Sequence, residues 1–445
     1  MHETAVPQVI FGWNAAWFAS IVFAVVYVLI IAEKMNRAIV ALLGAGLMIL
    51  GGLITQEAAI RGIDFNTIGL LLGMMVIVGV TGKSGVFQYL AVWSAKKVKA
   101  RPAGVLIMLS LVTAVLSALL DNVTTVLLIV PVTLLITEEL KVKPYPFLVS
   151  EILFSNIGGT ATLVGDPPNI MIGSAVGFTF NDFILHAAPA AVVVMVVSLP
   201  LVYLIWRKEL VTSESARNRV MNFHEREAIT DPRLLKQSLL VLTLVTLGFI
   251  LAHTLHLQPA TIAMFGAAAL LLLDNYRHGS EEQTRRVHHA FAEAEWVTLM
   301  FFAGLFMLVH GLEAAGVIHA MAKQLLEATG GDKTTTVLSI LWGSAILSSF
   351  VDNIPFVATM IPLIENLAPT FGGEEGLRPL WWALSLGACL GGNGSLIGAS
   401  ANLVVAGLAD RAGQPVGFLP FLKSAFLLMI LSIAISHVYI YFRYL

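Results

Sequence analysis

The sequence predicts an all-α polytopic membrane protein built from two inverted repeats. Each repeat is expected to hold five transmembrane helices plus a re-entrant hairpin, with broken helices at the midplane. Three observations predict this fold: an apolar composition, an order of apolar runs that occurs twice, and polar interruptions inside four of those runs. Of the 445 residues, 57% are hydrophobic and only 12% are charged, about half the charged fraction of a soluble domain.

Composition also excludes several kinds of function. Cys389 is the single cysteine, so neither a disulfide framework nor a thiolate metal cage is expected. The glycine clusters lack the G-K-[ST] ending of a P-loop. No basic tract suggests a nucleic-acid partner, and no nucleophile–base pair suggests an enzyme. We expect neither a cofactor nor a metal ion, and the first residues lack the basic start of a signal peptide.

The first repeat is predicted to cover residues 1–206. An amphipathic stretch at 85–99 should lie along the interface, and the run at about 103–137 is interrupted by Asp121-Asn122. Two half-length helices that meet at a polar tip describe a re-entrant hairpin better than two full spans. Full crossings are expected at 17–32, 38–54, 67–82 and 182–206.

The run at about 147–177 is long enough to cross a bilayer but cannot be one continuous helix. Gly158-Gly159 and Pro167-Pro168 break its backbone hydrogen bonds, and Asp166 would be costly in lipid. Broken backbone at membrane depth is tolerated only where it lines a cavity or is enclosed by protein. This stretch therefore predicts a binding site.

After a charged cytoplasmic linker at 207–233, the same order of segments begins again and fills a second repeat, residues 234–445. Its hairpin is expected at about 334–365 and its broken span at about 380–409. An amphipathic stretch at 313–327 precedes that hairpin. Crossings are expected at 235–255, 259–273, 296–312 and 418–444.

The two repeats can be aligned residue by residue. Asp121-Asn122 and Pro131 match Asp352-Asn353 and Pro362 at a spacing of 231. Two residues later in register, at a spacing of 233, three features of the broken spans correspond. These are Gly158-Gly159, Gly165 and Asn169, which match Gly391-Gly392, Gly398 and Asn402.

Basic residues set the expected orientation. With five crossings per repeat, 21 of the 26 lysines and arginines fall on one face and 5 on the other. The basic face should be cytoplasmic, which directs both termini away from the cytoplasm. An odd number of crossings also inverts the second repeat relative to the first, the architecture of many secondary transporters.

Two polar clusters are the candidate substrate or ion sites. Half-helix ends supply free backbone groups, and short polar side chains add neutral dipoles; some of the hydroxyls are expected only to cap helices. The first cluster comprises Asp121, Asn122, Thr124, Thr125, Thr160, Thr162, Asp166 and Asn169. The second comprises Asp352, Asn353, Asn393, Ser395, Ser400 and Asn402.

Three carboxylates in these clusters, Asp121, Asp166 and Asp352, are candidates for proton coupling. No lysine or arginine lies beside them in the sequence. Without such a partner, a carboxylate at membrane depth either exchanges protons or accepts a cation. The repeats differ here, since Asp166 corresponds to Ala399. We therefore expect the first cluster to carry the coupling and the second to recognise the substrate.

These motifs resemble the ion transporter superfamily, in particular its ArsB/NhaD branch, which also contains the melanosomal P protein. The resemblance rests on Ser155–Thr162, Gly165–Asn169, Asp352–Phe356 and Gly387–Asn402, and it covers nearly the whole chain. It implies a scaffold and a transport domain that moves by an elevator-like step. It also implies that Asp121, Asn122, Asp166 and Asn169 form one site, and Asp352, Asn353, Ser400 and Asn402 its mirror.

The expected function is export of arsenite or antimonite in exchange for protons across the plasma (inner) membrane. Aspartates at both hairpin tips disfavour an anion, whereas As(OH)₃ is neutral and offers three hydroxyls. A Na⁺/H⁺ antiporter is the alternative, followed by an organic-anion carrier or an ion channel. A soluble arsenite-stimulated ATPase is a possible partner at the linker, and the oligomeric state stays open.

Overall fold

The computed structural model describes residues 9–32 and 34–445, and every regular element in them is a helix. The first half holds α1 (Ala15–Ile31), α2 (Arg37–Leu50), α3 (Gln56–Arg61), α4 (Phe65–Gly82), α5 (Val86–Lys97), α6 (Pro102–Leu119), α7 (Asn122–Leu140), α8 (Tyr145–Thr160), α9 (Pro167–Val176), α10 (Phe180–His186) and α11 (Ala188–Trp206). The linker carries α12 (Glu214–Met221). The second half holds α13 (Pro232–Leu255), α14 (Pro259–Asn275), α15 (Ser280–Ala292), α16 (Trp296–Ala314), α17 (Val317–Thr329), α18 (Lys333–Phe350), α19 (Asn353–Glu365), α20 (Ala368–Phe371), α21 (Glu374–Gly391), α22 (Ser400–Arg411) and α23 (Phe418–Tyr444).

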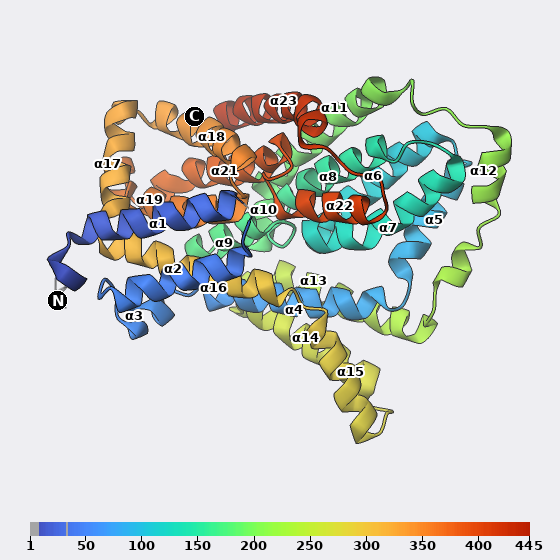
Figure 1. Cartoon of the computed structure of the whole chain (residues 1–445), viewed down its shortest axis with the longest axis horizontal. Coiled ribbons are helices and arrows are strands. Elements are labelled where there is room, and N and C mark those ends of the chain that lie inside the picture. The colour runs from blue at the N-terminus through green and yellow to red at the C-terminus, as the bar shows by residue number, and fades with distance from the viewer. Residues whose placement is uncertain (1–8, 33) are drawn as a thin grey trace.

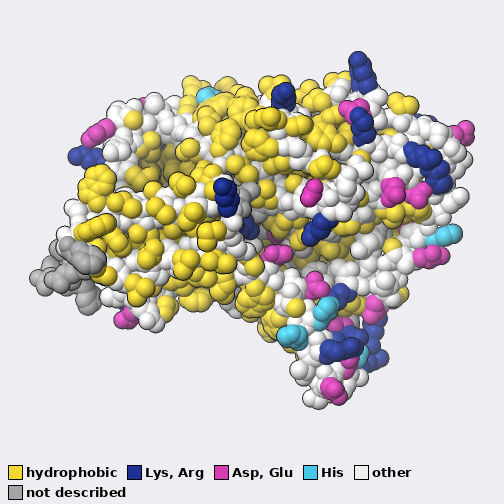
Figure 2. Space-filling view, in the orientation of Figure 1, with side chains coloured by type: hydrophobic (Ala, Val, Ile, Leu, Met, Phe, Trp, Pro, Cys, Tyr) yellow, Lys and Arg dark blue, Asp and Glu magenta, His cyan; other side chains and the backbone are white. Residues whose placement is uncertain are grey.

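Seven of the described helices are long and apolar enough to cross a membrane, and α1, α2, α14 and α19 are shorter apolar helices. Most long helices run along the horizontal axis of Figure 1, with α3 and α17 at the left end and α12 at the right end. Hydrophobic side chains cover the left and upper surface in Figure 2, whereas charged ones gather at the right end and over α15. The chain is therefore an all-α membrane protein, as the composition predicted.

Two helices are interrupted in the protein interior. Helix α8 ends at Thr160 and α9 begins at Pro167, with no helix between them. Asp166 has an extended backbone (φ −144°, ψ 132°), and proline suits the first turn of the helix that follows it. In the second half, α21 ends at Gly391 and α22 begins at Ser400. Both breaks are surrounded by protein, as unpaired backbone at this depth requires.

Each hairpin tip is held by the break of its own half. Asp121 lies in the short turn between α6 and α7, and its carboxylate accepts a hydrogen bond from the Thr124 amide at 2.8 Å. The Asn122 amide donates to the Gly165 carbonyl at 3.0 Å, and the Asn353 amide donates to the Gly398 carbonyl at 3.3 Å. The same backbone bond therefore joins hairpin and break in both halves.

Glycines allow the first arm of each hairpin to contact the broken helix beside it. A Cβ on Gly158 of α8 would lie 2.1 Å from the Ala114 carbonyl oxygen of α6. A Cβ on Gly391 of α21 would lie 2.6 Å from Cα of Ala345 in α18. Ala114 and Ala345 are related by the repeat spacing of 231, so both halves use the same close crossing.

Other contacts join the two halves. Helices α4 and α14 pack together, as do α2 and α16, and we call these four helices the framework. Helix α7 packs on α22 and α9 packs on α19, so each hairpin is completed by a half-helix of the other repeat. We call the eight helices of both hairpins and both broken spans the hairpin body. It comprises α6, α7, α8, α9, α18, α19, α21 and α22.

Candidate functional site

The centre of the hairpin body is a cluster of asparagine side chains. Asn156 of α8 donates through Nδ2 to Asn393 Oδ1 at 2.9 Å and to Asn402 Oδ1 at 3.0 Å. Its own Oδ1 accepts a hydrogen bond from Asn122 Nδ2 at 3.1 Å. These four residues come from both halves and are at most 2% exposed. The two polar clusters expected from the sequence therefore meet in one network.

Three further contacts cross between the halves. Asn353 Nδ2 lies 3.4 Å from Asp166 Oδ1, and Ser385 of α21 donates to Asn169 Oδ1 at 2.7 Å. The Cys389 thiol lies 3.4 Å from the same Asn169 oxygen. Cys389 and Asn156 occupy equivalent positions at the spacing of 233. Each break is thus bonded to the broken helix of the opposite half.

Several predicted site residues hold the broken backbone together. Thr160 donates to the Asn156 carbonyl, Thr162 to the Ala118 carbonyl, and Ser395 to the Ser349 carbonyl. The side-chain amides of Asn169 and Asn402 donate to carbonyls within their own breaks. These bonds tie the breaks to carbonyl oxygens in the last turns of α6, α8 and α18, and to carbonyls of the breaks themselves. Their hydroxyl and amide hydrogens are therefore not free for a substrate.

Asp121, Thr124 and Thr125 lie at the tip of the first hairpin. Asp121 is 4% exposed and begins α7, while Thr124 is partly exposed. Buried oxygens near this tip and in the adjacent break lack a hydrogen-bond partner among the described residues: Thr125 Oγ1, Asn122 Oδ1 and Asp166 Oδ2. Such atoms are rare in folded proteins and indicate a place where a proton, an ion or a substrate can bind.

Asp352 has a basic partner, contrary to the expectation that the three aspartates are uncompensated. Arg37, the first residue of α2, lies with its Nη1 2.9 Å from Asp352 Oδ2 and 2.6 Å from Ser400 Oγ. Its Nη2 donates to Thr298 Oγ1 of α16 at 3.2 Å. Ser400 also donates to Asp352 at 2.8 Å. The pair joins the framework to the hairpin body at the second tip.

This ion pair lines a cavity of about 630 Å³. The cavity lies between the framework and the hairpin body, and α1, α2, α7, α16 and α22 contribute to its wall. Its charged residues are Arg37, Arg411, Glu295 and Asp352. Two positive and two negative groups make the wall neutral overall, and Thr298 and Ser400 add hydroxyls. The cavity is thus suited to a small polar solute without a large charge of either sign.

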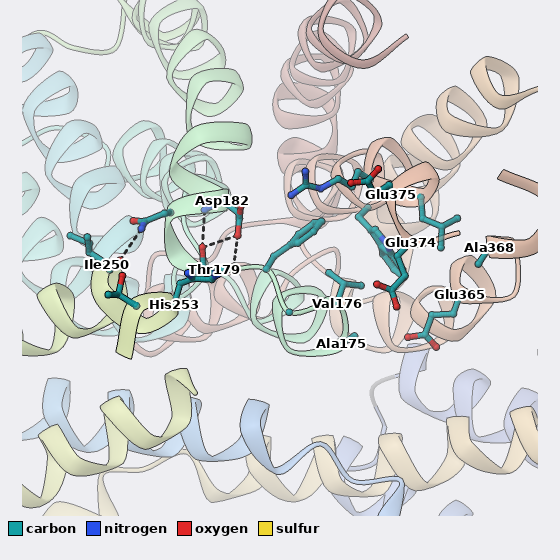
Figure 3. Close-up of a pocket in the computed structure, with 17 residues that line it drawn as sticks. Ala175, Val176, Thr179, Asp182, Ile250, His253, Glu365, Ala368, Glu374 and Glu375 are labelled. Atoms are coloured by element: carbon teal, nitrogen blue, oxygen red, sulfur yellow. Dashed lines mark hydrogen bonds between the residues drawn. The ribbon is translucent and has the colours of Figure 1, made fainter. Parts of the chain in front are cut away.

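A second cavity, of about 840 Å³, lies at the far ends of α9, α13 and α19. Figure 3 shows Glu365, Glu374 and Glu375 on one side of it and Asp182 with His253 on the other. It contains none of the residues predicted from the motifs. Its carboxylates lie on two opposite sides of the cavity, so we do not assign it the substrate site.

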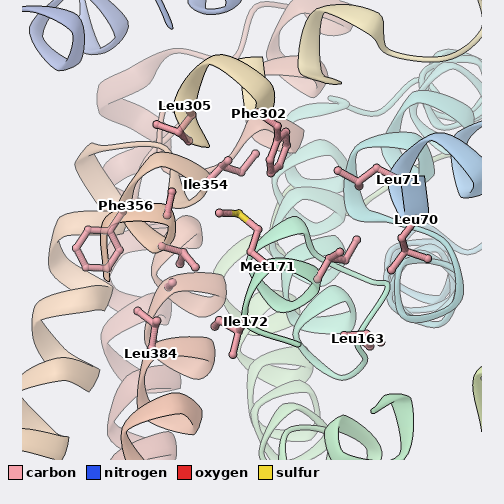
Figure 4. Packing of buried hydrophobic residues seen from close by; sticks show 14 of the residues in the cluster. Leu70, Leu71, Leu163, Met171, Ile172, Phe302, Leu305, Ile354, Phe356 and Leu384 are labelled. Atoms are coloured by element: carbon pink, nitrogen blue, oxygen red, sulfur yellow. The ribbon is translucent and has the colours of Figure 1, made fainter. Parts of the chain in front are cut away.

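Apolar packing separates these two cavities. Figure 4 shows Met171 of α9 and Ile354 of α19 beside Phe302 and Leu305 of α16. All four side chains are at most 2% exposed. The framework and hairpin body are therefore in dry contact along α9 and α19, whereas a cavity separates them beside α7 and α22.

The sequence missed Arg37, Thr298, Ser385 and the central role of Asn156. Asn156 belongs to the Ser155–Thr162 motif, which could have identified it. Thr298 belongs to the Glu295–Thr298 stretch that repeats Asp64–Thr67, a weaker signal. Arg37 carried no local signal, since its partner Asp352 lies 315 residues further along the chain.

Comparison with known proteins shows the family and the fold of this chain. The profile of the citrate transporter family, CitMHS, matches residues 27–387. An uncharacterized transporter of Mycobacterium bovis is 43% identical over 427 residues, covering 95% of this chain and 97% of its own. The 46 kDa membrane protein of Mycobacterium leprae is 41% identical, with 95% and 98% covered.

The P protein of Sus scrofa is 35% identical over 503 residues, which cover 95% of this chain and 59% of the P protein. Among solved structures, the YdaH transporter of Alcanivorax borkumensis superimposes with a TM-score of 0.55 at 16% identity. That alignment covers 97% of this chain and 98% of the transporter, and it shows a shared fold. The chain belongs to the citrate transporter family of the ion transporter superfamily and is a secondary transporter.

Proposed function

We propose that this transporter exports arsenite or antimonite in exchange for protons, within the ArsB/NhaD branch of its superfamily. The observation that carries the proposal is the neutral, hydroxyl-bearing cavity at Arg37, Asp352 and Ser400. As(OH)₃ is uncharged and presents three hydroxyls, which the carboxylate and Ser400 can bind by hydrogen bonds. The guanidinium holds the carboxylate in place through a charge-assisted hydrogen bond of 2.9 Å.

Alternating access follows from the two bodies. The hairpin body would slide against the framework in an elevator-like step, carrying the Asp352–Ser400 side of the cavity with it. The cavity lies at the end where α1 ends and α2 begins, the same end as the linker. By the distribution of basic residues this end is cytoplasmic, the halves are inverted, and both termini face outward. The structure then corresponds to an inward-open state in the plasma (inner) membrane.

Proton coupling belongs to carboxylates without a cationic partner. Asp166 meets this condition, since its Oδ2 has no partner among the described residues, and Asp121 meets it as well. Asp352, bound to Arg37, serves the substrate instead. The linker is the proposed contact for a soluble ATPase, and there Arg219 and Glu225 bind Glu139 and Lys96 of the chain itself.

Carriage of an organic anion is the second candidate. It is favoured by Arg37 and Arg411 in the cavity wall, together with the citrate transporter family to which the chain belongs. Unpaired aspartates at both hairpin tips would disfavour an anion. Asp352 at the second tip is paired with Arg37, so only the first tip keeps an aspartate without a basic partner among the described residues.

Transport by inside-out vesicles with an imposed pH gradient tests the proposal. We expect arsenite uptake that a protonophore abolishes, and an approximately tenfold slower uptake for Ser400→Ala, which loses a hydrogen bond to a charged group. Uptake of citrate but not arsenite would establish the second candidate. Proton movement evoked by Na⁺ without either uptake would instead make the chain a Na⁺/H⁺ antiporter.

A further inference from the structure

A buried glutamate inside the first hairpin has no role in the site described above. Glu151 is 1% exposed and belongs to α8, which packs against both α6 and α7. Its Oε1 accepts a hydrogen bond from the Thr133 hydroxyl of α7. Its Oε2 is buried and has no hydrogen-bond partner among the described residues. One oxygen of the carboxyl group therefore has a hydrogen-bond partner, and the other has none among the described residues.

No charge compensates Glu151 in the described part of the chain. Helices α6, α7, α11, α21, α22 and α23 pack against α8, and α6 has no titratable residue. On the linker side, the titratable groups of α8 and its neighbours are Tyr145, Glu138, Glu139, Tyr203, Asp410, Arg411 and Lys423. Those of α21 and the far end of α23 are Glu374, Glu375, Arg378, Cys389, His437, Tyr439, Tyr441, Arg443 and Tyr444. None of them forms a hydrogen bond or ion pair with Glu151.

Further buried polar side chains lie where α6 and α8 pack together, at the level of this glutamate. Ser150, its chain neighbour, and Ser110 of α6 lie with their Oγ atoms 2.5 Å apart. One turn further along α6, Thr113 Oγ1 is also buried without a partner. Ser117 of α6 donates to the Ser155 carbonyl, which places the end of this polar stripe beside Asn156. Polar groups thus extend from the Ser110–Ser150 pair, one residue from Glu151 in the chain, towards the central asparagine cluster.

The second repeat shows that the fold does not need these polar residues. At the repeat spacings of 231 and 233, Ser110, Thr133, Ser150 and Glu151 correspond to Leu341, Ile364, Ala383 and Leu384. All four counterparts are apolar and fully buried. Apolar residues in the same packing would be more stable than a buried, half-satisfied carboxyl group. The polar set in the first repeat therefore points to a function rather than to packing.

We propose that Glu151 is a proton-binding site of the transport cycle. The carboxylate takes up one proton to become a neutral acid, and the Thr133 oxygen can accept the resulting O–H. Loss of that proton leaves a charge that only water or a neighbouring polar group can stabilise, so release accompanies opening of the hairpin interior. The inference rests on the proposed function for its coupling to transport, but not for proton binding itself.

The test combines transport with infrared spectroscopy on the purified full-length protein. The variants are Glu151→Gln, which keeps the shape, and Glu151→Leu, which installs the residue found at the equivalent position 384. We expect both to fold, to keep arsenite exchange without a pH gradient, and to lose at least tenfold in proton-driven uptake. Glu365→Gln, at an exposed glutamate of α19, is the matched control and should keep both activities.

Infrared spectra separate a failure of this inference from a failure of the proposed function. In wild-type protein we expect a carboxylic-acid band that changes with pH, is absent from Glu151→Gln and is unaffected by Na⁺. Proton-driven uptake that survives in both Glu151 variants would overturn the inference while leaving arsenite export intact. A band that Na⁺ displaces would make Glu151 a cation site instead. If wild-type protein moves no protons with arsenite, the proposed function fails. Proton binding at Glu151 then stands if the pH-dependent band is present in wild-type protein and absent from Glu151→Gln, and falls if it is not.

Discussion

At the scale of single residues, the pairing of Arg37 with Asp352 determines the character of the cavity. Side-chain exposures of 25% and 10% place the pair at the boundary between solvent and protein. Neither residue could be assigned a partner from sequence, because helices α2 and α19 meet only in the folded chain. The sequence motifs located Asp352 correctly but gave it the wrong electrostatic environment.

A double-mutant cycle tests this pair. Arg37→Gln and Asp352→Asn should each lower the free energy of unfolding by about 1–3 kcal/mol, because each leaves a partly buried charge without its partner. The double variant should recover most of that loss, since both charges are then removed. Thermal unfolding in detergent measures all three variants. Strictly additive losses would mean that the two side chains do not interact.

Asn156 is the residue on which the asparagine cluster depends. Asn156→Asp keeps the size of the side chain but replaces two donated hydrogen bonds with repulsion from Asn393 and Asn402 oxygens. We expect the free energy of unfolding to fall by about 2–4 kcal/mol, with loss of transport. Cys389 occupies the equivalent position of the other repeat, and its thiol lies 3.4 Å from Asn169 Oδ1. Cys389→Ser keeps a donor there and should cost less than about 1 kcal/mol. Equal effects of the two variants would contradict the central role of Asn156.

At the scale of helices, local sequence features predicted the interruptions well. Gly158-Gly159 and Pro167-Pro168 lie at the end of α8 and the start of α9, and Asp121 and Asp352 lie at the starts of α7 and α19. These signals act within a few residues and are readable without the fold. Helix α5 buries one face, on which Phe87 and Ala91 are almost fully covered, as the amphipathic pattern of 85–99 indicated. Its position along the interface stays a prediction.

The close helix crossings make a prediction at this scale. Gly158→Ala would bring a methyl group into contact with the α6 backbone, so the helices must separate, at a cost of about 1–3 kcal/mol. Gly343→Ala is the matched control, since its Cβ meets no atom within 4 Å, and alanine there should stabilise α18 by up to about 1 kcal/mol. Calorimetry compares the two. Equal stability of both variants would mean that the crossing is looser than described.

At the scale of the whole molecule, the order of the segments and the repeat spacings could be predicted from the sequence. The contacts between the two halves could not. The bond from the Asn122 amide to the Gly165 carbonyl recurs in the second half, from Asn353 to Gly398. These are the residue pairs that the repeat alignment matches. The packing of α7 on α22 and of α9 on α19 depends on contacts between residues more than 200 positions apart. The sequence therefore predicted two separate polar clusters, whereas the folded chain joins them in one hydrogen-bond network.

The linker is held against the rest of the chain by an ion pair at the charged end of the molecule. We expect the stability of this contact to depend on pH. Lys96 Nζ lies 2.5 Å from Glu225 Oε2 and also donates to the Phe223 carbonyl at 2.8 Å. The hydrogen bond from Lys96 lowers the pKa of Glu225 below its ordinary value. The resulting stabilisation is present above the ordinary glutamate pKa of about 4.3 and is lost as the pH falls through the lowered value.

Hydrogen exchange of residues 222–230 measures this effect. We expect protection at neutral pH that decreases on acidification below about pH 4, and a Lys96→Gln variant that is unprotected at every pH. Protection that increases on acidification would have the wrong sign for this ion pair.

We propose that the cavity beside Arg37 and Asp352 opens to one side of the membrane and binds the substrate. Cysteine labelling tests it directly, because the native Cys389 is buried. Leu403→Cys lines this cavity and Ala175→Cys lines the other one. With a membrane-impermeant maleimide, Leu403→Cys should react only from the linker side and be protected by arsenite, while Ala175→Cys should react only from the opposite side. If arsenite leaves the labelling of Leu403→Cys unchanged, the cavity does not bind arsenite. If Leu403→Cys is labelled from the far side, the cavity does not open to the linker side.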